Sequence, residues 1–364
     1  MTINMQRVLH ADTVHWDQEL ARALALDADQ RGRDRATADP ARAGDVVMAA
    51  VRTQINQLRA LDPQVRHELP DSVTGMRVAT RQLRSILTGY TRILDSQRTT
   101  LVAEELKWLG AQLAEEHDTE VMIERFNQVI QALPDNLIVG PLACDIEQAL
   151  GQLAEQGEQT IMAALTSPRY HTLHQLLDQL LTNPPLTHRA QRPAHTELPK
   201  SLAKAVRRLN KRLTTAETLP EGTERDEALH EARKTDKQVR YMTEILIPII
   251  GKPARRLHKH TKKLQNLLGE YQDAVTARPI LKQLAHTAHN NGHNAFTYGL
   301  LYAIEHNRMQ DALTQLPNHL QQLRNPKTLT WLTPTQHTLP TIPRHEWTPA
   351  GPPAPEFQPS SLAG

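Results

Sequence analysis

The sequence VTGMRVATRQLR at residues 73–84 decides the fold, because LHEARKTDKQVR at residues 229–240 repeats its pattern 156 positions later. Cations coincide at three places in the two stretches: Arg77 with Arg233, Arg81 with Lys237, and Arg84 with Arg240. A second pair of blocks, residues 107–118 and 262–273, matches at an offset of 155. Two blocks in the same order and in nearly the same register indicate an internal repeat.

The composition favours helices throughout. Aromatic residues make up 4% of the chain, while Ala, Leu, Gln, Arg and Glu abound, and the alternation typical of strands is missing. We therefore predict an all-α fold of two pseudo-symmetric antiparallel helical bundles, about four main helices each, with a basic groove or pore between them. The expected organisation is a partly disordered leader or linker (1–44), a first bundle (45–182), a Pro-rich connection (183–199), a second bundle (200–332) and a Pro-rich disordered tail (333–364).

Individual helix ends follow from breakers and gaps in the apolar spacing. The first helix is predicted over 45–61, because Asp62-Pro63 disfavours helical backbone at the residue before the proline. Near the end of the second bundle, the spacing predicts separate helices over 252–268 and 273–290.

The cellular setting is constrained by cysteine content and hydropathy. One cysteine, Cys144, rules out an intramolecular disulfide and favours a reducing compartment. Charged side chains within residues 10–19 interrupt the apolar core that a secretory leader needs. No apolar run reaches the roughly 18 residues of a membrane span. We expect a cytoplasmic protein that does not enter a membrane.

The cations of each repeated stretch fall on one helix face. Positions 0, +3, +7 and +10 lie within an arc of roughly 80°. The resulting stripes are His230, Arg233, Lys237 and Arg240 in the second stretch, and Arg77, Arg81 and Arg84 in the first. Each stripe is about 15 Å long, enough for several phosphates of an extended chain, and arginine's planar fork matches phosphate oxygens. The alternative is that both stripes are solvated helix faces.

Neighbouring helices add further cations. Residues 200–263 hold seventeen Lys or Arg against eight Asp or Glu, so the net charge of +2 hides a strongly basic segment. Cations recur at helical spacing at Lys200, Lys204, Arg207 and Lys211, and at Arg255, Lys259 and Lys262, with Arg52 and Arg59 in the first half. The sequence therefore predicts a protein that binds a polyanion.

The repeated stretches, with the pattern L-x-x-x-L-[A/G]-E-x-x-D at 109–118 and 264–273, resemble the CHAD family, the conserved histidine α-helical domain, over about residues 45–330. The resemblance implies non-enzymatic binding of inorganic polyphosphate in the groove, often beside enzymes or granules that handle polyphosphate. The polyphosphate-binding residues expected from it, with supporting cations on flanking helices, are Arg52, Arg77, Arg81, Arg84, Lys204, Arg207, Arg208, Lys211, His230, Arg233, Lys234, Lys237, Arg240, Lys259, Lys262 and Lys263.

This sequence departs from the family pattern at two places. The first-half histidine is replaced by Thr74, while the second half keeps His230, and an arginine before the first aspartate is replaced by His117. Thr74 can hydrogen-bond a phosphate oxygen but contributes no charge. We expect phosphate binding to be retained, and the two halves of the site to be less symmetric.

Two other functions stay open. The stripes would also suit the backbone of a nucleic acid, although aromatic platforms for stacked bases are few. An accessory subunit or enzyme of phosphoanhydride metabolism would need clustered carboxylates for Mg²⁺. Asp118 and Asp273 stand alone, and each is expected to cap the helix it begins or to pair with a groove cation.

No cofactor and no metal site is expected. His258 and His260 are two positions apart on a predicted helix and so point to different sides. His286, His289 and His293 could share one face, but no carboxylate follows them at the spacing of a metal ligand.

Overall fold

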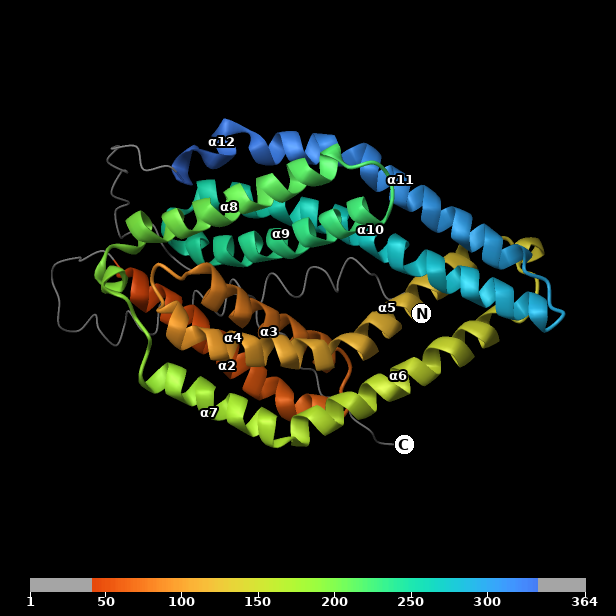
Figure 1. The fold of residues 1–364 in the computed structure, drawn as a ribbon, viewed down its shortest axis with the longest axis horizontal. Helices are drawn as coiled ribbons and strands as arrows, with labels where there is room; N and C mark the ends of the chain where they lie inside the picture. The colour runs from red at the N-terminus through yellow and green to blue at the C-terminus, as the bar shows by residue number, and fades with distance from the viewer. Residues whose placement is uncertain (1–40, 333–364) are drawn as a thin grey trace, which may run out of the picture. The chain divides into compact units, whose positions relative to one another are not determined.

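The computed structural model describes residues 41–332, which form helices joined by short turns (Figure 1). The predicted leader lies outside the described residues except for its last four positions, and the predicted tail lies outside them entirely. Within residues 41–332 there is no β-strand, and extended backbone pairs only at two isolated bridges, Arg42 with Pro193 and Leu94 with Leu186. The predicted all-α fold is confirmed, whereas the pseudo-symmetry of two bundles stays a prediction.

The long helices are, in chain order, α2 (Ala43–Arg66), α3 (Ser72–Gly89), α4 (Ser96–Gln112), α5 (Ala114–Ala132), α6 (Leu142–Thr166), α7 (Pro168–Thr182), α8 (Ala194–Thr218), α9 (Thr223–Ile250), α10 (Lys252–Asn290) and α11 (Phe296–Arg324). The short elements are the 3₁₀ turns η1 (Asp135–Leu137), η2 (His188–Gln191) and η3 (Thr330–Leu332), and α12 (Pro326–Leu329). Among the described helices, none combines the length and apolarity that a bilayer span needs.

Local chemistry sets several helix ends. The Asp95 carboxylate accepts a hydrogen bond from the Gln97 amide, 2.9 Å away, and so caps α4. Ser167 caps α7 in the same way, with Pro168 in the first turn where a missing N–H costs nothing. Gly251, at φ 75°, makes the turn between α9 and α10.

Two predicted helix boundaries are wrong, because tertiary contacts outweigh local breakers. Helix α2 continues through Pro63 to Arg66, where Arg66 Nε lies 2.5 Å from Asp62 Oδ1 and the Tyr170 hydroxyl donates to Asp62 at 2.6 Å. Helix α10 is continuous across the predicted gap between 268 and 273, since Leu268 and Tyr271 are buried there against the core.

The apolar core ties the first and second halves together. One cluster of buried side chains includes residues of α2, α3, α4 and α7 and also of α8, α9 and α10. A separate cluster lies between the far ends of four helices: Phe126 of α5, Ile146 of α6, Leu281 of α10 and Tyr298 of α11. Figure 1 shows these four helices extending together away from the other helices. Helices α3 and α9 both contribute to the first cluster, so the core that joins the two halves also holds these two helices together.

Candidate functional site

The site is built on α3 and α9, the helices that carry the two repeated stretches. They run side by side in the same direction, because Arg77 lies near Arg233 while Gly89, twelve residues on, lies against Met242. A β-carbon at Gly89 would be 2.5 Å from Met242 Sδ, so glycine permits the close approach. The buried Tyr90 hydroxyl donates to the Met242 carbonyl at 2.7 Å and fixes the two helices in register.

A groove of about 530 Å³ opens beside this contact, lined by α3, α4, α8 and α9. Its lining contains one carboxylate, Glu231, and nine Lys or Arg side chains: Arg77, Arg81, Arg84, Lys107, Arg208, Arg212, Arg233, Lys234 and Lys237. His230 and four hydroxyl side chains, Thr80, Ser85, Thr88 and Thr235, complete the polar wall. Such a lining concentrates positive potential where an anion can enter.

The two repeat-related aspartates lie beside the groove and pair with its arginines. Arg77 Nη1 lies 2.8 Å from Asp118 Oδ1, and Arg233 Nη2 lies 3.9 Å from Asp273 Oδ1. The predicted pairing with groove cations is confirmed. The alternative capping role is wrong, because α5 already begins at Ala114 and Asp273 lies inside α10.

Other polar contacts hold the α8 side of the groove against α9. Arg208 donates to the Gln238 side-chain carbonyl, and the Gln238 amide donates to Thr88 Oγ1 at 3.0 Å. Arg212 donates to the Glu231 carbonyl at 2.8 Å and to Thr235 Oγ1 at 2.5 Å. These contacts position two guanidinium groups of α8 at the rim.

The central cations repel one another. Burial, together with the charges of Arg81, Arg233 and Arg77, lowers the pKa of Lys237 to about 6. Burial and Arg81 also lower the pKa of Arg233, against the pull of Asp273. An anion in the groove would reverse this balance, since it would supply the opposite charge that the cations lack.

Three arginine donors in the groove have no acceptor. The Nε atoms of Arg81, Arg84 and Arg233 are buried and make no hydrogen bond within residues 41–332. A buried donor without a partner costs about 1–3 kcal/mol, more when it is charged. Folded proteins rarely leave such groups together unless they serve a function. The donors are therefore available to an oxyanion.

Half of the predicted binding residues line this groove: Arg77, Arg81, Arg84, Arg208, His230, Arg233, Lys234 and Lys237. The structure does not bring the other half into it: Arg52, Lys204, Arg207, Lys211, Arg240, Lys259, Lys262 and Lys263. Arg52, Lys204, Arg207 and Lys211 are exposed on α2 and α8, and Lys259 and Lys263 are exposed on α10. A shared helix face is therefore not enough to reach the groove.

Arg240 is the clearest correction. It aligns with Arg84, but its guanidinium is buried, with Nη1 2.7 Å from Glu244 Oε1 and Nε donating to Gln265 at 2.8 Å. The Glu244 carboxylate, itself 2% exposed, also contacts His258 Nε2 at 2.9 Å. Arg240 thus neutralises a buried carboxylate instead of facing the groove.

Two groove cations escaped the sequence prediction. Lys107 belongs to the second repeated block but was aligned there only for its register. Arg212 follows Lys211 directly and is one turn beyond Arg208, so the spacing of α8 contained the signal. For both residues, the sequence alone does not show which face of the helix packs against the core and which faces the groove.

Thr74, which stands where the family pattern has a histidine, contacts a histidine of the neighbouring helix. Thr74 Oγ1 lies 2.9 Å from Nδ1 of His117, and His230 Nδ1 lies 3.0 Å from Gln272 Oε1. Burial, and then the charge of Arg77, lower the pKa of His117 to about 4. Burial also lowers the pKa of His230. The Thr74 hydroxyl is thus already in contact with an imidazole.

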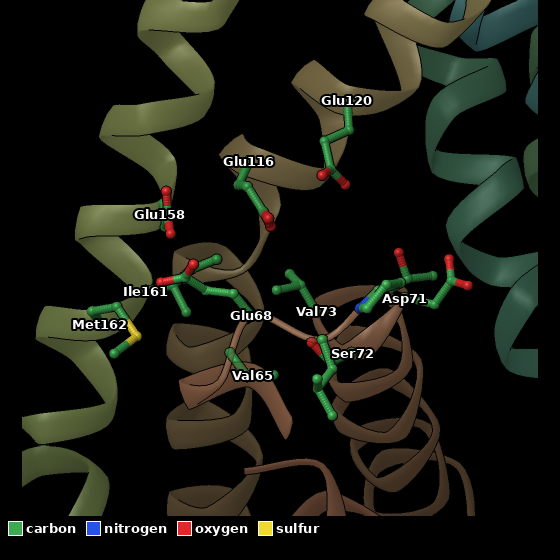
Figure 2. Close-up of a pocket in the computed structure, with 13 residues that line it drawn as sticks. Val65, Glu68, Asp71, Ser72, Val73, Glu116, Glu120, Glu158, Ile161 and Met162 are labelled. Atoms are coloured by element: carbon green, nitrogen blue, oxygen red, sulfur yellow. The ribbon is translucent and has the colours of Figure 1, made fainter. Parts of the chain in front are cut away.

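A second cavity, of about 250 Å³, lies on the other side of Thr74 and is acidic (Figure 2). Figure 2 shows Glu116, Glu120 and Glu158 around it, with Glu68 and Asp71 on the turn between α2 and α3. Burial, together with the charges of Glu120 and Glu158, raises the pKa of Glu116 to about 7. Within residues 41–332 no group of three or more His, Cys, Asp or Glu side chains is arranged to hold a metal ion.

Residues 41–332 thus form an all-α protein with an arginine- and lysine-lined groove. The chain belongs to the CHAD domain family, whose family model matches residues 49–282. The chain is 32% identical over 283 residues to two uncharacterized proteins of Mycobacterium tuberculosis, MT2285 of strain CDC 1551 and Rv2226 of strain H37Rv. These matches cover 77% of this chain and 53% of each relative, so the chain spans about half the length of the curated relatives it matches.

Two solved structures share the fold. PptA from Streptomyces chartreusis superposes with a TM-score of 0.63 at 20% identity, covering 77% of this chain and 99% of that one. The CHAD domain from the plant Ricinus communis superposes with a TM-score of 0.53 at 19% identity, covering 82% of this chain and 94% of that one. The resemblance seen in the sequence is therefore confirmed at the level of family and fold.

Proposed function

We propose that the groove between α3 and α9 binds inorganic polyphosphate without cleaving it, and that this binding directs the protein to polyphosphate granules. The observation that carries the proposal is the set of buried arginine donors without acceptors, at Arg81, Arg84 and Arg233, around a lysine whose charge the site disfavours. A chain of phosphates offers a hydrogen-bond acceptor and a negative charge at every unit. The arginine donors lack the acceptor, and Lys237 lacks the negative charge.

The close spacing of the groove cations favours a thin polyanion over a broad one. The cations come from two adjoining helices, Arg77 and Arg81 from α3 and Arg233 and Lys237 from α9, and the charges of the three arginines act on Lys237. Polyphosphate has no bases to accommodate beside these cations, whereas a nucleic acid must also place its sugars and bases. Binding rather than turnover is supported by the groove-side aspartates, since Asp118 and Asp273 are engaged by arginines.

The test is a calorimetric titration of the full chain with long-chain polyphosphate, single-stranded RNA and duplex DNA at matched phosphate concentration. We expect saturable binding that is strongest for polyphosphate. Preference for either nucleic acid would contradict the proposed ligand, and absence of saturable binding to polyphosphate would contradict the function. Release of orthophosphate, followed in the same samples with Mg²⁺ present, would contradict the proposal that the groove only binds.

A further inference from the structure

Each half of the chain contains the same contact between two helices, but the histidine is on a different helix in each half. In the repeat, Thr74 aligns with His230 at the offset of 156, and His117 aligns with Gln272 at the offset of 155. Both aligned pairs touch: Thr74 Oγ1 with His117 Nδ1 at 2.9 Å, and His230 Nδ1 with Gln272 Oε1 at 3.0 Å. The imidazole comes from α9 in the second half and from α5 in the first.

His117 lies outside the groove lining, beside the groove cation Arg77. Its partner Thr74 is one turn before Arg77 on α3, and its neighbour Asp118 pairs with Arg77 at 2.8 Å. The charges of Arg77, Arg81 and Lys237 all act on the His117 ring. Nε2 of this ring has no hydrogen-bond partner within residues 41–332 and is not shut off from solvent. The ring is therefore held at Nδ1 and open at Nε2, next to the groove cations.

The two contacts leave the two rings in different states. With the Gln272 carbonyl oxygen as its partner, Nδ1 of His230 donates and carries a proton. Nε2 of His230 can then donate to a phosphate oxygen once the ring takes up a second proton, which the negative charge of the phosphate favours. The Thr74 hydroxyl can donate to Nδ1 of His117, which leaves the proton on Nε2. A neutral His117 can therefore donate to a phosphate oxygen without taking up a proton.

We propose that His117 is a phosphate-binding residue of the groove, which supplies through Nε2–H the first-half contact that His230 supplies in the second half. This inference rests on the proposed function, because it adds a residue to the same site. Thr74 is a positioning residue in this arrangement, since its hydroxyl holds Nδ1 of His117 and, when it donates, leaves the proton on Nε2. The weakened symmetry expected from Thr74 is thereby offset by a histidine on the neighbouring helix.

The competing explanation is that His117 only supports the fold through Thr74. The sequence offers a way to separate the two, because the second half shows the reverse pair in place. The double variant Thr74→His with His117→Gln rebuilds in the first half the His and Gln arrangement of His230 and Gln272. A purely structural role for His117 predicts that His117→Gln lowers the melting temperature while the folded protein keeps its affinity for polyphosphate.

The experiment is a titration of the full chain with long-chain polyphosphate at pH 7 and fixed salt, for wild type, His117→Gln, the double variant, and His286→Gln. His286 is exposed on α10 and does not line the groove, so it controls for loss of a histidine. We expect His117→Gln to weaken binding about tenfold, the size of one hydrogen bond to a charged group. The double variant and His286→Gln should bind within about twofold of wild type, twofold being well below the effect of one such hydrogen bond.

Each outcome decides between the explanations. Unchanged binding by His117→Gln overturns the inference, as does a double variant that binds no better than His117→Gln. If circular dichroism shows that His117→Gln does not fold, the folded double variant is used instead. An affinity of the double variant for polyphosphate equal to that of wild type supports the inference, and weaker binding overturns it. Failure of wild type to bind polyphosphate contradicts the proposed function instead, so the two failures are distinguishable.

Discussion

Binding of polyphosphate should be accompanied by uptake of a proton at Lys237. Burial and the charges of Arg81, Arg233 and Arg77 lower the pKa of this lysine to about 6 in the free protein. At pH 8 such a group is protonated in about one molecule in a hundred. Phosphate oxygens would return its pKa toward 10.5, so about one proton should be taken up for each groove that is filled.

The assay is calorimetric titration in several buffers of different ionisation enthalpy, all at pH 8 and the same ionic strength. The observed enthalpy should depend linearly on the buffer's ionisation enthalpy, with a slope of about one proton for wild type. Lys237→Arg is the matched control, because arginine keeps the charge and does not deprotonate. It should bind polyphosphate with a slope near zero. A wild-type slope near zero, or equal slopes for both proteins, would refute the reasoning.

The remaining predictions concern salt, pH and packing. With about six cations engaged, raising salt from about 50 to about 200 mM should weaken binding roughly 300-fold in titrations; a threefold loss would contradict the electrostatic account. Glu116 has its pKa raised to about 7, so its ionisation destabilises the fold as pH rises from about 4.5 to 7. Glu116→Gln should therefore raise the free energy of unfolding at pH 8 by about 1 kcal/mol after allowing for solvent screening, and so raise the melting temperature there but not at pH 4; equal shifts of the melting temperature at both pH values would contradict this. Gly89→Leu should cost about 1–3 kcal/mol against Met242 in chemical denaturation, and Gly299→Leu, which faces open space, should cost less.

The central part of the site could be predicted from the repeat. Arg77, Arg81, Arg233 and Lys237 occupy matching positions in the two stretches, and the structure brings all four into one groove. The pairing of Asp118 and Asp273 with groove arginines followed from the same alignment. A repeat constrains where a side chain points because both copies must pack their apolar faces in the same core.

The outer part could not be predicted, because a helical wheel does not say which neighbour covers which face. Arg240 continues the stripe of α9 but turns to a buried glutamate one turn along the same helix. On α8 the face with Arg208 meets the groove, while Lys204 and Lys211 remain outside its lining. The contact between Thr74 and His117 joins residues 43 positions apart, a distance over which sequence spacing carries no geometric information.

The most direct test of the account compares two double variants with the same change in formal charge. Arg81→Glu with Lys237→Glu reverses two groove cations, and Lys204→Glu with Lys259→Glu reverses two exposed cations outside the groove lining. In titrations with long-chain polyphosphate at moderate salt, the groove variant should bind at least about 100-fold more weakly than wild type, with unchanged helicity. The outer variant should stay within about threefold, because exposed charges beyond the groove are largely screened. Equal weakening of the two variants would mean that net charge, and not the groove between α3 and α9, attracts the polyanion.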